Sequence, residues 1–198
     1  EPLEEGRPVE HALLIGQAGT RHQTHRVLQV GSLSAFLWSP DGSELAVADR
    51  QDMESPFFER LRIVSADGAT VRTIAEEQVI AFFWSPSGEQ IAWVSLVPDE
   101  RLFEWTVASR TGDSLRRIFR FQPSGDVLAM LSFFDQYAHS HSPWSPDSTR
   151  LVVAGTQASL GGRNGQSPSG DRIFVLEVSG ATPPQEIAAG SLAFWSWN

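Results

Sequence analysis

The feature that most constrains the fold is a short sequence that recurs three times in register. It reads FLWSPDGSELAVA at 36–48, FFWSPSGEQIAWV at 82–94 and SPWSPDSTRLVVA at 142–154, and a fourth copy begins as AFWS at 193–196. The tryptophans of successive copies are 46, 60 and 51 residues apart. Repetition at roughly 40–50 residues indicates a repeat architecture, in which each copy is one supersecondary unit that packs against its neighbours.

Each copy has the chemistry of a β-hairpin. In the first copy Ser39, Pro40, Asp41 and Gly42 suit the four corners of a type I turn, because proline fixes φ at the second corner and glycine suits the last. The second copy has a serine in place of the aspartate and the third has Ser148 in place of the glycine, and neither change forbids the turn. The residues that define the repeat are Trp38, Pro40, Asp41, Gly42, Trp84, Pro86, Gly88, Trp144, Pro146, Asp147 and Trp195. Their fixed place predicts that the tryptophans pack between units rather than stack on a carbohydrate.

Two further strand-like runs follow each hairpin, at 60–65 and 70–75, at 104–108 and 115–121, and at 172–178 and 185–188. An N-terminal pair at 11–15 and 25–30 has the pattern of two outer strands without an inner hairpin. We therefore predict an all-β chain of 15 strands, organised as a β-propeller of four-stranded antiparallel blades. The predicted divisions are the outer strands of a partial blade at 1–30, blades at 31–76, 77–122 and 123–190, the last with a long loop leading into it, and the first strand of the next blade at 191–198.

About four blades are represented, and the unequal ends leave two alternatives. In one, the chain is a segment of a larger propeller. In the other, the C-terminal strand completes the N-terminal blade, which is then closed imperfectly, one strand short. Closure matters because unpaired sheet edges are free to pair with other chains.

The Trp-Ser-Pro-Asp-Gly turn followed by Leu-Ala-Val resembles the repeat of the TolB-like propellers, often called the WD40-like or PD40 repeat. The resemblance covers residues from about 11 to 198. Similar repeats occur in a periplasmic translocation-associated protein, in the gating domain of prolyl-oligopeptidase-like enzymes and in some polysaccharide lyases. The resemblance therefore implies a propeller fold, and it is compatible with both a binding role and an enzymatic one.

Composition argues against several other classes. The net charge is −9, whereas a protein that grips nucleic-acid phosphates needs a basic face. The one basic cluster, Arg116, Arg117 and Arg120, alternates with apolar residues as a solvated strand face does. No apolar run approaches the roughly 18 residues of a membrane helix, so membrane association is expected only through a partner. The chain has no cysteine, which excludes disulfides and thiolate metal sites, and no cofactor is expected.

The longest departure from the repeat lies between residues 121 and 144. Ser124 is a predicted helix cap, and the helix runs to about Ser132 with Val127, Leu128 and Leu131 on its buried side. The segment that follows, 133–141, is predicted to lie at a channel mouth. It supplies the candidate binding residues Asp135, Gln136, Tyr137, His139 and His141.

Two interpretations of this segment compete. On a strand, the alternate residues His139 and His141 would point the same way, as metal ligation requires, and with Asp135 or Gln136 they would form a metal or acid–base site. That arrangement faintly resembles the metal site of the lyase relatives. In the second interpretation, hydrogen bonds fix the loop while Tyr137 and the phenylalanines plug the channel. We prefer the second, because the sequence places no third strong ligand.

Two more insertions interrupt the repeat. Residues 156–169 include Arg163 within a glycine-rich run, but the phosphate-binding pattern of such loops needs a lysine and the chain has none. Residues 49–59 include Phe57 and Phe58 beside acidic residues, which suits either protein contact or packing over the blade edge. Both insertions are expected on one face of the propeller.

These observations predict a non-catalytic scaffold that binds another protein in an exported or envelope-associated, extracytoplasmic setting. The alternative is a propeller hydrolase or lyase that uses His139 and His141, or an accessory propeller of a peptidase. No Gly-x-Ser-x-Gly motif is present to supply a serine nucleophile. The functional prediction rests on the fold.

Overall fold

The computed structural model describes residues 11–16, 24–51, 54–158 and 170–196. The described strands are β1 (His11–Gly16), β2 (Thr24–Val30), β3 (Leu33–Trp38), β4 (Glu44–Arg50), β5 (Arg60–Ser65), β6 (Val71–Ala75), β7 (Val79–Trp84), β8 (Gln90–Val97), β9 (Leu102–Ser109), β10 (Arg116–Pro123), β11 (Arg150–Gln157), β12 (Arg172–Glu177) and β13 (Gln185–Ala189). Two short helices, α1 (Gly125–Leu131) and α2 (Phe134–Tyr137), lie between β10 and β11. Within the described ranges, no helix is long and apolar enough to cross a membrane.

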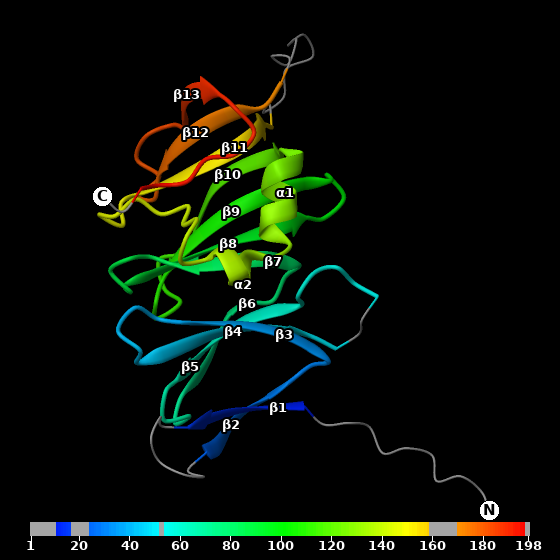
Figure 1. The fold of residues 1–198 in the computed structure, drawn as a ribbon, viewed down its shortest axis with the longest axis vertical. Coiled ribbons are helices and arrows are strands. Elements are labelled where there is room, and N and C mark those ends of the chain that lie inside the picture. Colours follow the sequence, from blue (N-terminus) through cyan, green and yellow to red (C-terminus); the bar gives the residue numbers. More distant parts are fainter. Residues whose placement is uncertain (1–10, 17–23, 52–53, 159–169, 197–198) are drawn as a thin grey trace, which may run out of the picture.

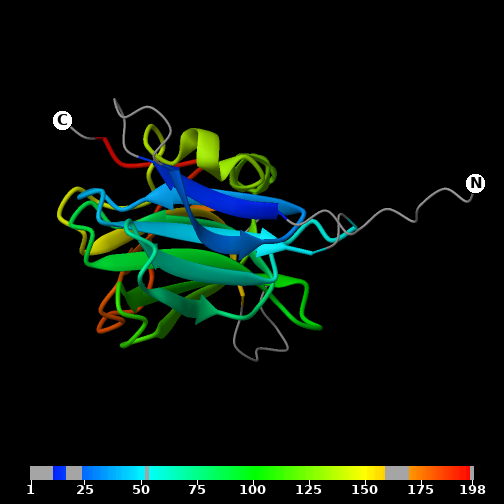
Figure 2. The same cartoon turned by 90° about the horizontal axis from the view of Figure 1, so that it is seen from below.

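The strands form antiparallel sheets that stack along the long axis of the molecule (Figure 1). The pair β1–β2 lies at one end, followed by the first unit, β3-β4-β5-β6, and the second unit, β7-β8-β9-β10. The third unit, β11-β12-β13, lies at the other end. Seen along the stack, the two helices lie together along one side of it (Figure 2). The chain is thus mostly β, and each complete unit is a meander of four sequential strands.

The second and third units are joined into a single sheet of seven strands in the described part of the chain. The join is short, because β10 pairs with β11 over three residue pairs only, from Phe121 with Gln157 to Pro123 with Gly155. Elsewhere each unit pairs internally over four to eight residue pairs. The link between these two units is therefore a narrow strip of backbone.

The described residues contain 13 strands, two fewer than the 15 expected from the sequence. The inner strand of the third unit is reduced to one isolated bridge between Trp144 and Leu151. Proline accounts for part of this loss, because Pro143 has no N–H to donate to a ladder. At the C-terminal end, residues 191–196 form no strand, where the sequence predicts the first strand of another blade.

The predicted turns form in all three copies. A backbone hydrogen bond closes each one, from Gly42 N to Ser39 O, from Gly88 N to Ser85 O and from Ser148 N to Ser145 O, all at 2.9 Å. The closing residue has positive φ in each copy, and at Ser148 the value is 61°. Ser148 is held there by its hydroxyl, which accepts a hydrogen bond from Ser87 N at 2.9 Å. Serine replaces glycine at this corner because a neighbouring turn supplies a partner.

Carboxylates brace the first and third turns. The Oδ1 atom of Asp147 accepts hydrogen bonds from Ser145 Oγ at 2.6 Å and from Thr149 N at 3.0 Å and Oγ1 at 2.7 Å. These bonds, that of Ser145 first, hold the pKa of Asp147 well below its usual range. Asp41 is bound in the same way by Ser39 and Ser43, with the same lowering of its pKa.

We expect these turns to make stability acid-sensitive. A carboxyl group whose pKa is depressed by folding contributes stability at a pH above its unfolded value of about 4, and the contribution is lost as the pH falls through the folded value. The free energy of unfolding should therefore decrease as the pH is lowered beyond about 4. In Asp147→Ser this decrease should be smaller. Serine is the matched replacement, because the second copy carries Ser87 at this position. Urea unfolding at a series of pH values measures the effect, and an unchanged acid slope in the variant contradicts it.

The main core lies between the first, second and third units. Its largest fully buried side chains include Phe82, Trp93, Phe121 and Trp144. Helix α1 begins as predicted at Ser124, whose side chain accepts from Val127 N at 3.1 Å. Val127 and Leu131 are buried, but Leu128 is not, which corrects the predicted face. Residues 127 and 131 share one side of a helix, whereas 128 lies about 100° around it.

Gly155 makes the narrow join between the second and third units possible. Its φ is +154°, and a Cβ there would lie 2.3 Å from the carbonyl oxygen of Gln122 and 3.0 Å from the ring of Phe121. We expect Gly155→Ala to lower the free energy of unfolding by about 2–4 kcal/mol, because a backbone atom must move. Gly125→Ala is the control, since nothing lies within 4 Å of its Cβ position. Equal losses in the two variants, measured by urea unfolding, would contradict this account.

Candidate functional site

The loop leading into the third unit folds differently from the strand that the metal interpretation requires. Residues 134–137 form helix α2, and turns follow up to residue 140. Phe134 anchors the segment, because its ring is buried against Phe82, Phe83 and Phe58 at centroid distances of 4.7, 5.8 and 6.4 Å. The strand on which the metal interpretation of His139 and His141 depends is therefore not formed.

A cavity of about 390 Å³ lies where this loop meets the first two units. It opens at the ends of the inner strands β3 and β7, next to the proline turns. Its lining residues are Leu37, Trp38, Ser39, Pro40, Phe83, Trp84, Ser85, Pro86, Ala138, His139 and Ser142. Repeat residues from two units and loop residues from the third thus share one concave surface, which makes it the candidate site.

The cavity carries little that would do chemistry. His139 is the only titratable side chain among its lining residues. The Ser39 hydroxyl donates to Asp41 Oδ1 at 2.6 Å and accepts from Glu44 N at 3.0 Å. The Ser85 hydroxyl is bonded to Ser87 Oγ and to Gln90 N in the corresponding turn. Both hydroxyls are thus occupied in holding their turns, and the hydroxyl of the third serine, Ser142, accepts from Trp144 N at 3.2 Å. The lining residues include no carboxylate–histidine pair that would activate a nucleophile.

The two histidines face different surroundings. His139 is exposed and lines the cavity. His141 is half-buried, its Nδ1 lies 2.8 Å from Ser140 Oγ, and its ring meets Tyr137 and Phe194 edge-on at 5.4 and 4.4 Å. The described residues include no group of three or more histidines, aspartates or glutamates placed to hold a metal ion.

The other candidate residues are dispersed. Asp135 and Gln136 are exposed on α2, and Tyr137 is exposed beside His141. Phe57 and Phe58 are half-buried and pack against the main core, so neither projects as a free contact. Arg163 lies outside the described residues. Of the residues predicted as a binding set, only His139 lines the cavity.

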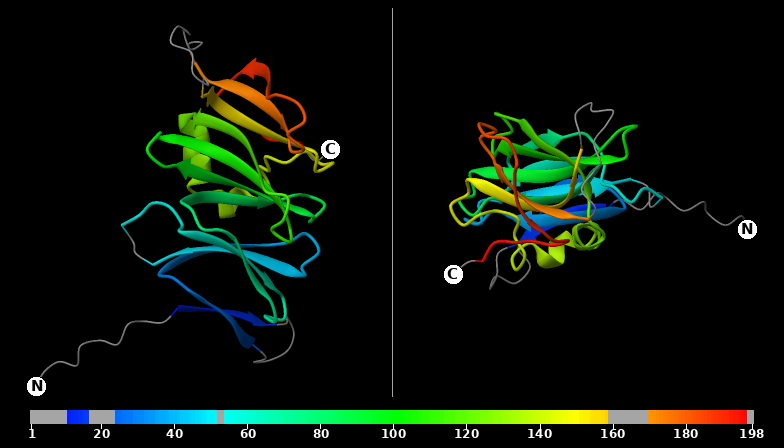
Figure 3. Two further views of the ribbon diagram at one scale, coloured as in Figure 1. Left: turned by 180° about the vertical axis from the view of Figure 1, so that it is seen from behind. Right: turned by 90° about the horizontal axis from the view of Figure 1, so that it is seen from above.

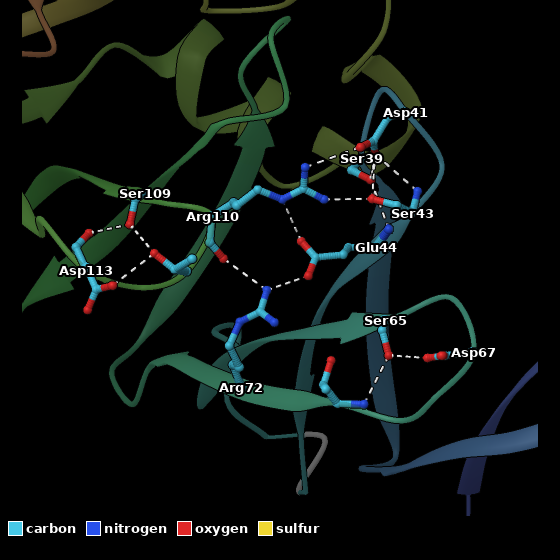
Figure 4. Close-up of polar contacts among 12 residues, drawn as sticks. Ser39, Asp41, Ser43, Glu44, Ser65, Asp67, Arg72, Ser109, Arg110 and Asp113 are labelled. Carbon is cyan, nitrogen blue, oxygen red and sulfur yellow. Dashed lines mark hydrogen bonds and ion pairs between the residues drawn. The ribbon is translucent and has the colours of Figure 1, made fainter.

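Charged side chains tie the first two units together near the cavity (Figure 4). Arg110 crosses from the second unit to the first, where Nε donates to Glu44 Oε2 at 2.8 Å and Nη2 donates to Ser43 Oγ at 2.7 Å. Arg72 Nη2 donates to Glu44 Oε1 at 2.5 Å and to the carbonyl of Arg110 at 3.1 Å. This network fixes how the first two units meet.

The basic cluster that the sequence places on a solvated strand face is neutralised by acidic neighbours. Arg120 Nε donates to Glu104 at 2.7 Å, and Arg117 lies 3.3 Å from Glu104 and 3.6 Å from Glu77. Arg116 donates instead to the carbonyl of Val178 at 2.9 Å. These arginines join strands and units, and they form no surplus of positive charge of the kind that phosphate backbones need.

Sequence reasoning missed an apolar surface on β3. Phe36 and Trp38 are exposed on one side of this strand, although the repeat predicts that Trp38 packs between units. The signal was present, because the N-terminal pair of strands was already recognised as lacking an inner hairpin. That missing hairpin leaves the side of β3 that is turned away from the second unit without a covering strand among the described residues.

No protein-family model matches the sequence, and no curated protein matches it. Among solved structures, an oligogalacturonate lyase in complex with manganese is similar at a TM-score of 0.53 and 15% identity, over 84% of this chain and 39% of that one. Oligogalacturonate lyase from Vibrio parahaemolyticus is similar at a TM-score of 0.53 and 18% identity, over 89% of this chain and 41% of that one. A putative TolB from Agrobacterium tumefaciens has a TM-score of 0.48 and 15% identity, over 86% of this chain and 55% of that one.

The likeness to the lyases is one of fold. The chain spans about two fifths of the length of the lyase chains it matches. At 15% and 18% identity, what the structures share is the arrangement of antiparallel strands, and the similar structures are propeller proteins. The chain therefore has propeller-like architecture.

Proposed function

We propose that this chain is a non-catalytic, protein-binding module, and that the cavity beside His139 receives an apolar side chain of an extended peptide from its partner. The observation that carries the proposal is the lining of the cavity. Indole and proline surfaces from two units surround it, and one imidazole supplies a polar contact at its rim. Apolar pockets with few polar groups are typical of binding sites.

The enzyme hypothesis needs more than the cavity contains. General acid–base catalysis requires a titratable group within hydrogen-bond reach of each proton that moves. The cavity has one such group, and two of its three serines, Ser39 and Ser85, use their hydroxyls to hold their own turns. This difference favours binding over hydrolysis or elimination as the function of the site.

The proposal also includes a protein partner in a periplasmic or exported setting. This part rests on the resemblance of the Trp-Ser-Pro-Asp-Gly repeat to TolB-like propellers. The net charge of −9 and the paired arginines on β10 speak against nucleic acid as the partner.

Peptide selection followed by calorimetry tests the proposal. Peptides are selected from a displayed random library, synthesised, and titrated into the intact chain and its variants. We expect Ala138→Trp, which fills the cavity, and His139→Ala, which removes its polar rim, each to weaken binding at least tenfold. Leu115→Ala is the matched control, because Leu115 is exposed but does not line the cavity, and it should bind as the unaltered chain does.

Two results would contradict the proposal. One is that no selected peptide distinguishes Ala138→Trp from the Leu115→Ala control. The other is turnover of an oligogalacturonide in the presence of Mn²⁺ that disappears in His139→Ala, which would restore the enzyme hypothesis. Thermal unfolding of each variant shows that the loss of binding is not a loss of fold.

A further inference from the structure

The repeat tryptophans join each unit to the one before it through the same backbone acceptor. Trp84 Nε1 donates to the carbonyl of Leu37 at 3.0 Å, and Trp144 Nε1 donates to the carbonyl of Phe83 at 3.1 Å. In both cases the acceptor immediately precedes the tryptophan of the preceding unit. The interface between units therefore has one repeated chemistry, in which an indole recognises an inner strand.

The surface of β3 that would meet a preceding inner strand is open. Trp38 is 41% exposed, whereas Trp84 is 8% exposed and Trp144 is fully buried. Phe36 is 51% exposed, although Phe82, its counterpart in the second unit, is fully buried. We call the exposed surface of Phe36 and Trp38, which as alternate residues share one side of the strand, the β3 face. None of the described residues accepts a hydrogen bond from the Trp38 indole.

The N-terminal strands cover only the other half of the first unit. Side chains of β1 and β2, including Leu13, Ile15 and Val27, pack on Leu45 and Val64. In the described part of the chain, β1 pairs with β2 alone, so its second edge is free. No described strand therefore covers the β3 face, whereas in the next two units the equivalent tryptophan packs on a preceding inner strand.

The C-terminal segment has the sequence of an inner strand but no strand partner among the described residues. Residues 192–196 carry the inner-strand sequence of the repeat but form no strand. Trp195 N donates to the carbonyl of Ser142 at 3.2 Å, and the Arg150 guanidinium lies 5.4 Å from the centre of the Trp195 ring. The Trp195 indole has no hydrogen-bond partner among the described residues, and Phe194 is 47% exposed.

We propose that segment 192–196 of one copy of this chain seats on the β3 face of a second copy, where the Phe194 carbonyl accepts a hydrogen bond from the Trp38 indole. The contact continues the interface that the chain already makes twice between its own units. Phe194 precedes Trp195 as Leu37 precedes Trp38, so it presents the carbonyl that an indole of the repeat recognises.

A second copy is the occupant because, within one copy, segment 192–196 does not lie at the β3 face. The pair β1–β2 and the third unit lie at opposite ends of the stack, and views from opposite sides agree (Figures 1 and 3). The segment is held at the third unit by Ser142, Arg150 and His141. The contact joins two different surfaces, so it is head-to-tail, and repeated copies either close a ring or extend a filament.

Light scattering after size-exclusion chromatography tests the proposal by measuring mass over a wide range of protein concentration. The measured mass of the unaltered chain should increase with protein concentration to a multiple of the single-chain mass. Trp38→Ala should remain a single chain, and so should a truncation after Ser191, which keeps the Ser124–Ser191 hydrogen bond. Leu115→Ala, a substitution of a residue that is equally exposed elsewhere, should assemble normally.

A mixture gives the sharper result. Trp38→Ala keeps segment 192–196 but has a damaged β3 face. The chain truncated after Ser191 keeps the β3 face but lacks segment 192–196. Together they should form a one-to-one dimer that grows no further, since only one productive contact is available. A same-face contact would not be rescued by this mixing.

A chain that stays single at every concentration would overturn the proposal, and so would assembly that Trp38→Ala leaves unchanged. A chain that stays single leaves the peptide-binding function standing, because that function is measured through Ala138→Trp and His139→Ala. Trp38 also lines the cavity, so Phe36→Ala is the assembly variant that leaves the cavity lining intact, and it should stay a single chain and still bind the selected peptide. Conversely, loss of peptide binding with intact assembly leaves the head-to-tail contact standing.

Discussion

Trp144→Ala is expected to lower the free energy of unfolding by about 3–5 kcal/mol, the range for truncating a fully buried aromatic side chain. The side chain of Trp144 is completely buried between the second and third units. Its removal leaves a cavity in close-packed surroundings and takes away the hydrogen bond to the Phe83 carbonyl. Because single domains have stabilities of about 5–15 kcal/mol, this one substitution should bring the chain close to unfolding at ambient temperature.

The repeat supplies its own control for this prediction. Trp38 occupies the same place in the motif but is 41% exposed and lacks a described acceptor for its indole. Trp38→Ala should therefore cost about 1 kcal/mol or less, since less apolar area is lost and no buried cavity forms. Urea unfolding followed by circular dichroism, at a concentration where the chain is single, measures both variants. Similar losses would mean that packing between units does not determine the role of these tryptophans.

Much of the fold follows from local sequence. The Ser-Pro-Asp-Gly corner specifies a turn because each residue suits its φ, and all three turns form. The strands β1, β2 and β5 begin and end within one residue of their predicted limits. The helix cap at Ser124 is also as predicted. These features depend on neighbours in sequence, so sequence alone describes them well.

Features set by contacts between distant residues were not predictable in the same way. Helix α2 owes its place to Phe134, which packs against phenylalanines more than 50 residues away in sequence. The cavity combines two proline turns with His139, and nothing in the spacing of these residues shows that they meet. Trp38 is exposed because no strand of the described ranges covers it, whereas the motif predicts the same burial for Trp38 as for Trp84.

A buried ion pair in the first unit was missed for the same reason. The side chain of Asp49 is fully buried at the end of β4, and Arg60 binds it with two hydrogen bonds, of 2.9 and 2.7 Å. Arg62 Nη2 donates to it at 2.8 Å, and Gly31 N donates at 2.8 Å. Burial alone would raise the pKa of Asp49, but the bonds from Arg60 and Gly31 and the charge of Arg62 outweigh it, so the pKa lies below its ordinary value.

Asp49→Asn should lower the free energy of unfolding by about 3–5 kcal/mol, because removing one partner of a buried ion pair leaves the other charges uncompensated. The guanidinium groups of Arg60 and Arg62 on β5 would remain without the carboxylate that β4 supplies, and the side chain of Arg62 is only 11% exposed. Asparagine keeps the shape and one acceptor oxygen, so the loss reports charge rather than volume. Urea unfolding at neutral pH measures it.

Asp135→Asn is the matched control, since Asp135 is exposed on α2 and has no described arginine partner. Its effect should stay within about 0.5 kcal/mol. The double variant Asp49→Asn with Arg62→Met removes one of the two unpaired positive charges. It should recover part of the lost stability, since the penalty for an unpaired buried charge is then smaller. A full loss of stability in Asp49→Asn, with no recovery in the double variant, would show that the Gly31 hydrogen bond matters more than the charges. The loss would then come from the backbone of the β2–β3 connection and not from electrostatics.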